Sequence, residues 1–325
     1  MNVKKDLRPQ RNHQILNPVR INALRRLSNN SKCYYLDYKL VSKESIDKLH
    51  SSFNFEIAAG SQSFFISTCL RYEMYHFLNG AQKVENNKTF ASISGALCVR
   101  RLLAILCGLQ SEIISEFEIF MQTGVAIHDA AAQKKISKKL FWDLYEIMQI
   151  AQDIRNRYNL NVKENYSTVG ARFLDLKIEY PATVAIVGGG YMAESFLRNI
   201  NQNKVKRIIW INRSVDKVKR LIKDFNLKST IGVFFQTFES APPALQKADF
   251  VFVAARGCGG MFKDMVLPKA KCVVDVSYPA LFSFECCKEF YTISNTYFER
   301  WVENPVPKET VLEVETVLDD IMRQI

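Results

Sequence analysis

The sequence predicts an α/β protein in two parts, an N-terminal α+β domain and then a doubly wound parallel sheet with a short C-terminal helix. After residue 180, short apolar runs alternate with helical stretches, which is the pattern of a parallel sheet covered by helices. A glycine turn joins the first of these runs to a helix. Between residues 90 and 180 the apolar periodicity is mainly helical, and it follows three strand-like runs.

The glycine turn lies within residues 183–193. An apolar run at 184–187 predicts a buried strand, and residues 194–200 predict a helix. Between them Gly188, Gly190 and Ala193 fit the Gly-x-Gly-x-x-Gly/Ala pattern, whose small residues let backbone approach a pyrophosphate. We therefore expect a Rossmann-type dinucleotide site with contacts from Gly188, Gly189, Gly190, Tyr191, Met192 and Ala193. The alternative is a strand-to-helix turn that binds no nucleotide.

The next apolar run, 207–211, predicts which dinucleotide binds. It ends about 20 residues past the last small residue, where a side chain that reads the ribose is expected. An acidic residue there would favour NAD, but the chain has Asn212, Arg213 and Ser214, with Lys217 one turn later. Arginine can pair with a 2′-phosphate, so we expect NADPH. The alternative is a solvated basic start of a helix.

The remaining elements follow from periodicity and capping residues. Strands are predicted at 33–40, 63–69 and 71–78, with a helix at 42–53 between the first two. Ser115 and Glu118 form a Ser-x-x-Glu capping box, and helices are predicted at 94–109, 115–133, 137–158 and 167–179. The second domain is predicted to have a helix at 216–225 and strands at 183–187, 207–211, 233–235, 250–254 and 272–276. We expect an N-terminal arm at 1–30, and then domains at 31–165, 166–300 and 301–325.

Composition excludes several classes of protein. No stretch of the 325 residues approaches the ~20 apolar residues of a membrane span, and the eight cysteines form no Cys-x-x-Cys pair. We expect no metal site and a cytoplasmic protein with reduced thiols. The net charge of +11 favours a polyanionic partner such as RNA. Seven of the 44 lysines and arginines lie before residue 30, in an arm that either holds RNA or is merely solvated.

A second chemical centre is the segment Ser-Thr-Cys-Leu-Arg at residues 67–71. Taken alone, Cys69 is either a buried structural cysteine or a nucleophile whose thiol pKa is lowered by Arg71. The segment and its continuation resemble the Ser-Thr-Cys-Asn-Arg-x-Glu-x-Tyr motif of the glutamyl-tRNA reductase family. Further motifs resemble that family in the same order, at 108–111, 115–122, 167–170, the glycine turn, 212–214 and 275–279.

The resemblance, which covers about residues 33–300, implies a mechanism. In the family, a cysteine thiolate attacks the ester of glutamyl-tRNA, and NADPH reduces the resulting thioester to glutamate-1-semialdehyde, the first step of C5 tetrapyrrole (5-aminolevulinate) synthesis. This would make Cys69 the nucleophile in residues 31–165 and glutamyl-tRNA the partner, with hand-off of the aldehyde to a semialdehyde aminomutase. The implied substrate-binding residues are Thr68, Leu70, Arg71, Ser111, Glu116, Phe117, Glu118 and Gln122.

Several positions depart from the family pattern. Leu70 stands for its Asn, Glu118 for its Gln, and Arg101 for its active-site His. Glu118 would repel a glutamyl carboxylate unless one of the two is protonated or paired, and arginine stays protonated and cannot act as a general base. Three alternatives therefore stay open: a reductase of another aminoacyl-tRNA, a non-catalytic tRNA-binding paralogue, and an oxidoreductase acting on a free small molecule.

Apolar residues spaced three and four apart predict one amphipathic helix at 307–325. The family usually carries a long helical dimerisation domain after the cofactor domain, so the chain reads as a divergent, short member that lacks most of it. The helix either packs back on the protein or forms an oligomer contact. Either a monomer or a dimer is compatible with this pattern.

Overall fold

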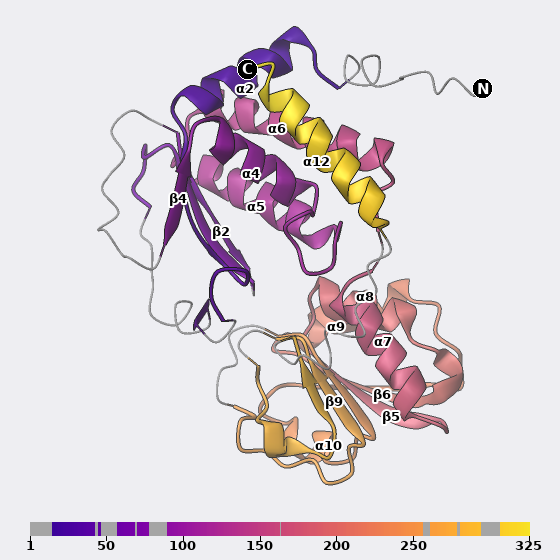
Figure 1. Ribbon diagram of the computed structural model, residues 1–325. Coiled ribbons are helices and arrows are strands. Elements are labelled where there is room, and N and C mark those ends of the chain that lie inside the picture. The colour runs from indigo at the N-terminus through magenta and orange to yellow at the C-terminus, as the bar shows by residue number, and fades with distance from the viewer. Residues whose placement is uncertain are drawn as a thin grey trace, which may run out of the picture. The chain divides into compact units, whose positions relative to one another are not determined.

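The computed structural model describes residues 15–42, 45–46, 57–68, 70–77, 90–162, 164–255, 261–277, 280–293 and 306–325. The chain forms two compact units (Figure 1). Unit 1 comprises Met1–Lys163 together with Asn304–Ile325, and unit 2 comprises Glu164–Glu303. The division at residue 163 lies two residues before the expected boundary, and the C-terminal segment belongs to unit 1.

Unit 1 contains an antiparallel sheet with the strand order β2-β3-β1-β4. Its strands are β1 (Lys32–Asp37), β2 (Ser63–Thr68), β3 (Arg71–His76) and β4 (Ala91–Ser94). The first three lie where alternation and aromatic content predict strands. The fourth was not predicted, because Ala-Ser-Ile-Ser offers only one large apolar side chain to the pattern. Most of the helix predicted at 42–53 lies outside the described residues.

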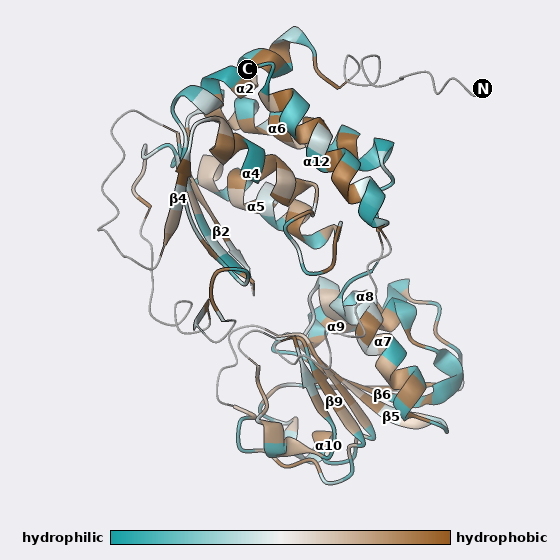
Figure 2. Ribbon diagram, viewed as in Figure 1, coloured by the Kyte–Doolittle hydropathy of each residue, from teal (hydrophilic) through white to brown (hydrophobic). Residues whose placement is uncertain are grey.

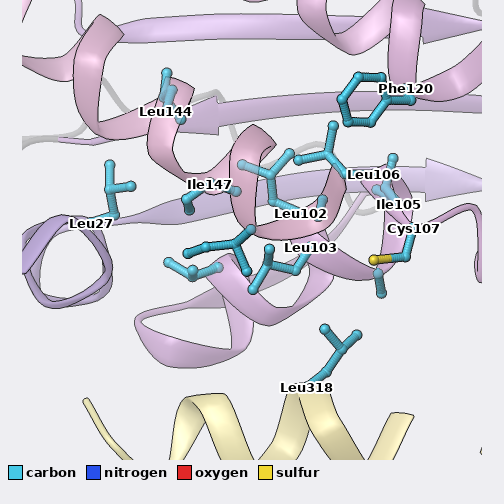
Figure 3. Close-up of a cluster of buried hydrophobic side chains, with 14 of the residues drawn as sticks. Leu27, Leu102, Leu103, Ile105, Leu106, Cys107, Phe120, Leu144, Ile147 and Leu318 are labelled. Carbon is cyan, nitrogen blue, oxygen red and sulfur yellow. The ribbon is translucent and has the colours of Figure 1, made fainter. Parts of the chain in front are cut away.

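Helices pack against this sheet and against one another around one core (Figure 3). They are α2 (Pro18–Asn29), α4 (Ala96–Leu106), α5 (Glu118–Ala132), α6 (Lys138–Arg157) and α12 (Lys308–Met322). Helix α4 contributes Leu102, Leu103 and Leu106 to the middle of the core, where these side chains are fully or almost fully buried. The long helix predicted at 137–158 is confirmed, and the Ser137 side chain caps it by accepting from the Leu140 amide.

The N-terminal basic segment is not an arm throughout, which corrects the expectation for residues 18–29. The Asn17 side chain caps α2 by accepting from the Arg20 amide, and Pro18 occupies the first turn, where its missing N–H costs nothing. Leu24 and Leu27 are buried in the core. The basic residues mask an amphipathic helix in the sequence pattern: Arg25 and Arg26 are exposed on one side of it, and the leucines are buried on the other. Residues 1–14 lie outside the described residues.

The helix predicted from Ser115 starts three residues later, so the predicted capping box is wrong. Ser115 has a left-handed backbone (φ 71°), and its hydroxyl donates to the Leu160 carbonyl instead of capping a helix. Helix α5 begins at Glu118, preceded by Phe117, which makes no side-chain cap. The Ser-x-x-Glu spacing is present, but the tertiary contact to Leu160 takes the serine away from the helix start.

Helix α12 packs back on unit 1, the first of the two predicted alternatives for this segment. Val314, Leu318 and Ile321 are buried in the same core as α4, and Figure 3 shows Leu318 directed toward that helix. Arg100 of α4 donates to Glu315 and to Asp319, both at 2.6 Å. Figure 2 shows α12 alternating between hydrophobic and hydrophilic along its length.

Unit 2 is a parallel sheet with the order β10-β9-β8-β5-β6-β7. Its strands are β5 (Ala182–Val187), β6 (Val205–Ile211), β7 (Gly232–Gln236), β8 (Phe250–Val253), β9 (Cys272–Asp275) and β10 (Phe290–Thr292). Counted from β5 as the first strand, the order is 3-2-1-4-5-6, that of a dinucleotide-binding Rossmann fold. The doubly wound sheet is therefore confirmed, and β10 is an addition to the five predicted strands.

Unit 2 begins with a helix, and further short helices follow between its strands. They are α7 (Tyr166–Lys177), α8 (Tyr191–Asn199), α9 (Val215–Leu221) and α10 (Pro242–Leu245), with 3-10 turns at Gln202–Lys204, Ile222–Asp224 and Phe284–Cys286. Asn165 and Thr168 form a reciprocal capping box at the start of α7. Within the described residues, none of the helices is both long enough and apolar enough to cross a membrane.

Candidate functional site

The strand register of unit 1 builds a polar row at one end of the sheet. Arg71, the first residue of β3, pairs with Asp37 of β1 on one side and with Thr68 of β2 on the other. Two residues along, Glu73 pairs with Tyr35, and alternate residues of a strand share a face. Arg71 and Glu73 therefore point to the same side of the sheet, where Arg101 of α4 reaches Glu73.

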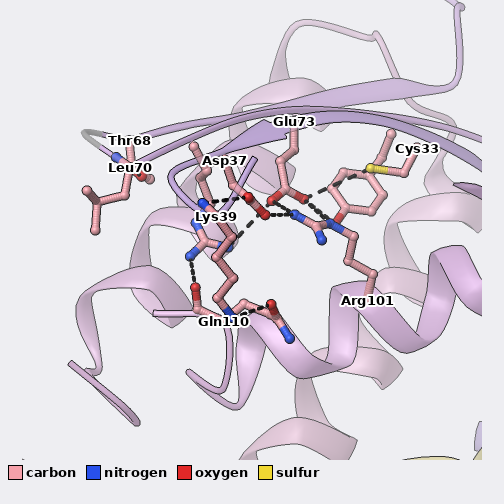
Figure 4. Close-up of polar contacts among 10 residues, drawn as sticks. Cys33, Asp37, Lys39, Thr68, Leu70, Glu73, Arg101 and Gln110 are labelled. Carbon is pink, nitrogen blue, oxygen red and sulfur yellow. Dashed lines mark hydrogen bonds and ion pairs between the residues drawn. The ribbon is translucent and has the colours of Figure 1, made fainter. Parts of the chain in front are cut away.

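Arg101 links the buried carboxylates of this face (Figure 4). Its Nη2 donates to Asp37 Oδ2 and to Glu73 Oε1, each at 2.7 Å, and its Nε donates to Glu73 Oε2 at 3.2 Å. Its guanidinium lies 3.6 Å from the centre of the Tyr35 ring, a cation–π contact. Burial disfavours the charged guanidinium, but Glu73 and the other anionic groups more than offset this and raise the pKa of Arg101.

Glu73 is fully buried and is held by several donors. Besides Arg101 it accepts from the Tyr75 hydroxyl at 2.8 Å and from Arg71 Nη1 at 3.4 Å. Arg71 also donates to the backbone carbonyl of Gln110 at 2.5 Å, so its guanidinium is oriented from two sides. The Lys39 ammonium reaches the Gln110 side chain at 2.9 Å. Three cations, Lys39, Arg71 and Arg101, thus lie close to the two carboxylates Asp37 and Glu73.

The loop that carries Gln110 and Ser111 is held by a buried arginine. Arg155 of α6 has no exposed surface and donates to the carbonyls of Leu106, Ser115 and Leu160, at 3.2, 2.7 and 2.7 Å. Gly108 has φ 76°, and a Cβ atom there would lie 2.6 Å from the Ser115 Cα. Burial lowers the pKa of Arg155, and its charged hydrogen bonds to these carbonyls hold the loop.

Glu116 is the titratable group of this loop with an unusual pKa. Burial raises its pKa to about 7, and the neighbouring Glu118 adds to the effect, while Ser111 and Arg71 oppose it. Near neutral pH this carboxyl therefore exists both protonated and ionised. It lies within the electrostatic reach of Arg71, next to the cluster at the ends of β2 and β3.

The structure brings part of the predicted substrate set together. Thr68 accepts from the Leu70 amide at 3.2 Å, and both lie buried beside Arg71 at the strand ends. The loop residues Ser111 and Glu116 are near Arg71, whereas Phe117 packs against the core and Gln122 of α5 is exposed. Cys69, the predicted nucleophile, lies outside the described residues, between Thr68 and Leu70.

The glycine turn of unit 2 has the geometry that a dinucleotide requires. Gly188 follows β5 with φ 116°, and a Cβ there would lie 2.2 Å from the Ala254 carbonyl oxygen. The Trp210 indole donates to the Gly188 carbonyl at 2.6 Å and holds the turn against β6. A Cβ on Gly190 would meet nothing within 4 Å, so the turn is open where a pyrophosphate would approach. Ala193 is fully buried, as the third small residue should be.

Helix α8 starts at Tyr191, directly after Gly190, three residues earlier than predicted. The side chain of Tyr191 is 61 % exposed, and Met192 accepts from the Ser167 hydroxyl at 3.3 Å. At the end of β6, the Asn212 side chain donates to the Ser214 carbonyl, and Ser214 caps α9. Arg213 is exposed beside them. The open turn and the helix start that follows it fit the pyrophosphate of a dinucleotide.

Sequence reasoning missed Asp37, Lys39, Glu73 and Arg155. On a strand, charged residues that alternate with apolar ones normally point to solvent, so Arg71 and Glu73 gave no signal of a buried cluster. Arg101 was singled out by the resemblance, but its carboxylate partners were not. Among the described residues, no three His, Cys, Asp or Glu side chains gather as around a metal ion. The segments 256–260 and 278–279 lie outside the described residues.

Two domain families match the chain. Residues 32–158 match the glutamyl-tRNA(Glu) reductase N-terminal domain, and residues 175–280 match the shikimate / quinate 5-dehydrogenase family. The first match covers β1 to α6, including the polar cluster. The second covers the strands β5 to β9 and the glycine turn. Unit 2 is thus a nucleotide-binding domain of the dehydrogenase type.

Individual relatives agree with these matches. A glutamyl-tRNA reductase from Methanocaldococcus jannaschii is 25 % identical over 228 residues, covering 67 % of this chain and 56 % of the relative. One from Thermus thermophilus is 27 % identical over 236 residues, covering 66 % and 57 %. The structure of the Methanopyrus kandleri glutamyl-tRNA reductase covers 90 % of this chain and 79 % of its own, with 17 % identity and a TM-score of 0.42.

The chain spans about half the length of the curated relatives that it matches. The two family matches, at residues 32–158 and 175–280, contain the Cys69 motif and the glycine turn. In sequence, this chain is similar to the glutamyl-tRNA reductases, with a match to their N-terminal domain over residues 32–158.

Proposed function

We propose that this protein reduces glutamyl-tRNA to glutamate-1-semialdehyde with NADPH, through a thioester on Cys69. One observation carries the proposal: a match to the N-terminal domain of glutamyl-tRNA reductase stands in the same chain as a dehydrogenase-type nucleotide-binding unit. The first unit would supply the nucleophile and the amino-acid pocket. The second would hold the hydride donor.

In the first step, the Cys69 sulfur forms a bond to the carbonyl carbon of the aminoacyl ester. The bond from that carbon to the tRNA 3′ oxygen breaks, and the oxygen leaves with a proton. A nicotinamide bound in unit 2 would supply the hydride that converts the thioester to an aldehyde and releases the thiolate. The reaction is expected in the cytoplasm, where thiols such as Cys69 stay reduced.

Arg71 is suited to orient the amino acid next to this nucleophile. It lies two residues after Cys69, is buried, and is held by Glu73 and the Gln110 carbonyl. An arginine positioned in this way loses little side-chain freedom when it binds a carboxylate. A buried guanidinium next to the predicted nucleophile favours an anionic substrate group.

Glu116 can carry the proton that Arg101 cannot. Arginine stays protonated throughout the physiological range, whereas the pKa of Glu116 is raised to about 7. We propose that the protonated Glu116 donates toward the leaving 3′ oxygen and that its ionised form takes up the next proton. This role would compensate for the histidine that the family has at the position of Arg101.

The amino acid is the part of the proposal with a specific rival. Leu70 is buried beside Arg71 where the family motif has Asn, and Glu118 adds a carboxyl near Glu116. Both changes reduce the number of donors for a glutamyl carboxylate. A reductase of another aminoacyl-tRNA is therefore the second candidate.

The test is a single-turnover reaction of the full chain with charged tRNA, with and without NADPH, for wild type and Cys69→Ser. Loss of glutamyl-tRNA and formation of aldehyde that need both Cys69 and NADPH are expected. Reduction of a different aminoacyl-tRNA would favour the second candidate. If tRNA binds but no charged tRNA is deacylated, the chain is a tRNA-binding paralogue. NADPH oxidation that needs neither Cys69 nor tRNA would contradict the proposal.

Because the aldehyde is reactive, we also propose its direct transfer to the aminomutase that consumes it. A pull-down with the purified protein is expected to recover that enzyme. Recovery of none would contradict direct transfer and would leave the reductase activity to be judged by the single-turnover reaction.

A further inference from the structure

The outward face of α6 has an unusual composition. Lys138, Trp142, Tyr145, Gln149, Gln152 and Asn156 are three or four residues apart, so they form one stripe along the helix. Trp142 is 52 % exposed and Tyr145 is 42 % exposed, and their rings meet edge to face with centroids 5.6 Å apart. The stripe contains no acidic residue.

Two of the acidic residues of α6 border this stripe, because Glu146 follows Trp142 by four residues and Asp153 follows Gln149 by four, and arginines of α2 neutralise all the acids of the helix. Helix α6 has three of them, Asp143, Glu146 and Asp153. Arg26 of α2 binds Asp143 with contacts of 2.5 and 2.9 Å, and Arg20 of α2 contacts Glu146 at 3.5 Å and Asp153 at 2.6 Å. The contact between α2 and α6 therefore uses all the negative charge of α6, and none offsets the lysines at its start.

Four lysines gather where α5 turns into α6. Lys134 and Lys135 lie in the turn, and Lys138 and Lys139 form the first turn of α6. Within the described parts of the chain, none of these four ammonium groups has a hydrogen bond or an ion pair. Lysines at a helix N-terminus oppose the helix dipole, so helix stability does not explain Lys138 and Lys139.

The backbone that carries these lysines is held in place. Gly60 donates to the Lys134 carbonyl at 2.9 Å, and Gln62 donates to the Lys135 carbonyl at 2.8 Å. The Gln62 side chain accepts from the Ser137 amide at 3.0 Å. The charged turn is thus attached to the start of β2, the strand whose far end carries Thr68.

We propose that this surface, made of Lys134, Lys135, Lys138, Lys139, Trp142 and Tyr145, binds the tRNA. The inference rests on the proposed function, and it names where the tRNA body is held. Unpaired lysines suit the phosphate backbone, and exposed aromatic rings suit stacking on an unpaired base. Clustered cations with no acid among them favour a polyanion over a typical protein partner, whose interface cores are depleted in lysine.

The surface lies away from the ester that would react. Gln62 and Thr68 are six residues apart along an extended strand, which corresponds to about 20 Å. The lysines would therefore contact the tRNA some way from its 3′ end. Neutralising them should weaken tRNA binding without changing the residues next to Cys69.

The test measures binding of uncharged tRNA(Glu) transcript to the full chain at several salt concentrations. The variant Lys138→Gln/Lys139→Gln is compared with Lys247→Gln/Lys263→Gln, which removes two exposed lysines of unit 2. We expect the first variant to lose roughly tenfold in affinity and to reduce the salt slope by about two, while the second stays close to wild type. Trp142→Ala should weaken binding roughly fivefold or more, and Trp142→Phe should restore most of it.

The outcomes separate this inference from the proposed function. If both lysine variants bind tRNA with the same affinity and the same dependence of affinity on salt concentration, the proposed tRNA-binding surface is wrong, while the reductase proposal is unaffected. A wild-type protein that binds no tRNA would overturn both. If Trp142→Ala abolishes self-association seen by light scattering while tRNA binding is unchanged, the surface is a protein interface and the inference is wrong.

Discussion

Replacing Arg101 by methionine should destabilise unit 1 strongly, because it leaves two buried carboxylates without their main partner. Glu73 has no exposed surface and the Asp37 side chain is 5 % exposed, and both accept from Arg101 at 2.7 Å. Removing one partner of a buried ion pair typically costs 3–5 kcal/mol. The loss of the Tyr35 cation–π contact adds about 0.5–1 kcal/mol, so we expect a total of about 4 kcal/mol.

Arg100 provides a matched control on the same helix. It also contacts two carboxylates, Glu315 and Asp319 at 2.6 Å, but Asp319 is 48 % exposed and Arg100 is 25 % exposed. Exposed ion pairs are screened by water, so Arg100→Met should cost about 1 kcal/mol or less. The same chemical change thus has a several-fold larger effect one residue further along the helix.

Hydrogen exchange read by mass spectrometry suits this comparison, because peptides of unit 2 serve as an internal reference. We expect Arg101→Met to raise the exchange of β1 and β3 peptides and to leave the peptides of β5 and β6 unchanged. By differential scanning calorimetry, unit 1 should unfold roughly 10 °C lower. Equal effects of Arg100→Met and Arg101→Met would refute the buried-cluster reasoning.

Three further predictions concern the loop and the glycine turn. Glu116→Gln should flatten the pH dependence of unit 1 stability. A carboxyl whose pKa is raised from 4.5 to about 7 on folding stabilises the folded state below pH 4.5, and about 3 kcal/mol of the free energy of unfolding is lost as pH rises through 7. Urea unfolding at pH 5 and pH 8 measures this, and the same stability difference between the two pH values in wild type and variant would contradict it. Arg155→Met leaves three buried carbonyls without their donor and should lower the free energy of unfolding by about 3 kcal/mol. Hydrogen exchange in residues 107–117 should become faster, and unchanged protection there would show that Arg155 does not hold the loop. Gly188→Ala should unfold unit 2, because its Cβ would collide with the Ala254 carbonyl. Gly190→Ala should fold normally and weaken NADPH binding by roughly tenfold or more. Thermal-shift measurements with and without NADPH distinguish the two variants, and equal behaviour of both would contradict the turn geometry.

The parallel sheet of unit 2 could be predicted because its buried strands are short, nearly continuous apolar runs. Residues 184–187 and 250–253 show this, and the glycine turn between strand and helix fixes the direction of the chain. The strand order adds β10 (Phe290–Thr292) at the edge, a segment too short to give a pattern of its own. Local composition was sufficient for these central strands because β5 and β8 are buried along their whole length.

The polar cluster of unit 1 could not be predicted, because its partners come together only through tertiary structure. Asp37 and Arg71 are neighbours by strand register, and Arg101 reaches Asp37 from a helix 64 residues later in the chain. From the sequence pattern alone, a charged residue on a strand is predicted to face solvent, because the helix that neutralises it cannot be identified. Likewise, Ser115 fits a capping box in sequence, but in the structure its hydroxyl donates to the Leu160 carbonyl and therefore does not cap the helix.

The most direct test of the account is to look for the acyl group on Cys69. Full-length protein is mixed with radiolabelled glutamyl-tRNA without NADPH, quenched in acid and digested, and the labelled peptide is identified; a second sample is chased with NADPH before the quench. The account predicts label on the peptide that contains Cys69, its absence from Cys69→Ser, and its loss as aldehyde during the chase. Aldehyde formation with no label on that peptide, or label on another residue that survives Cys69→Ser, would contradict it.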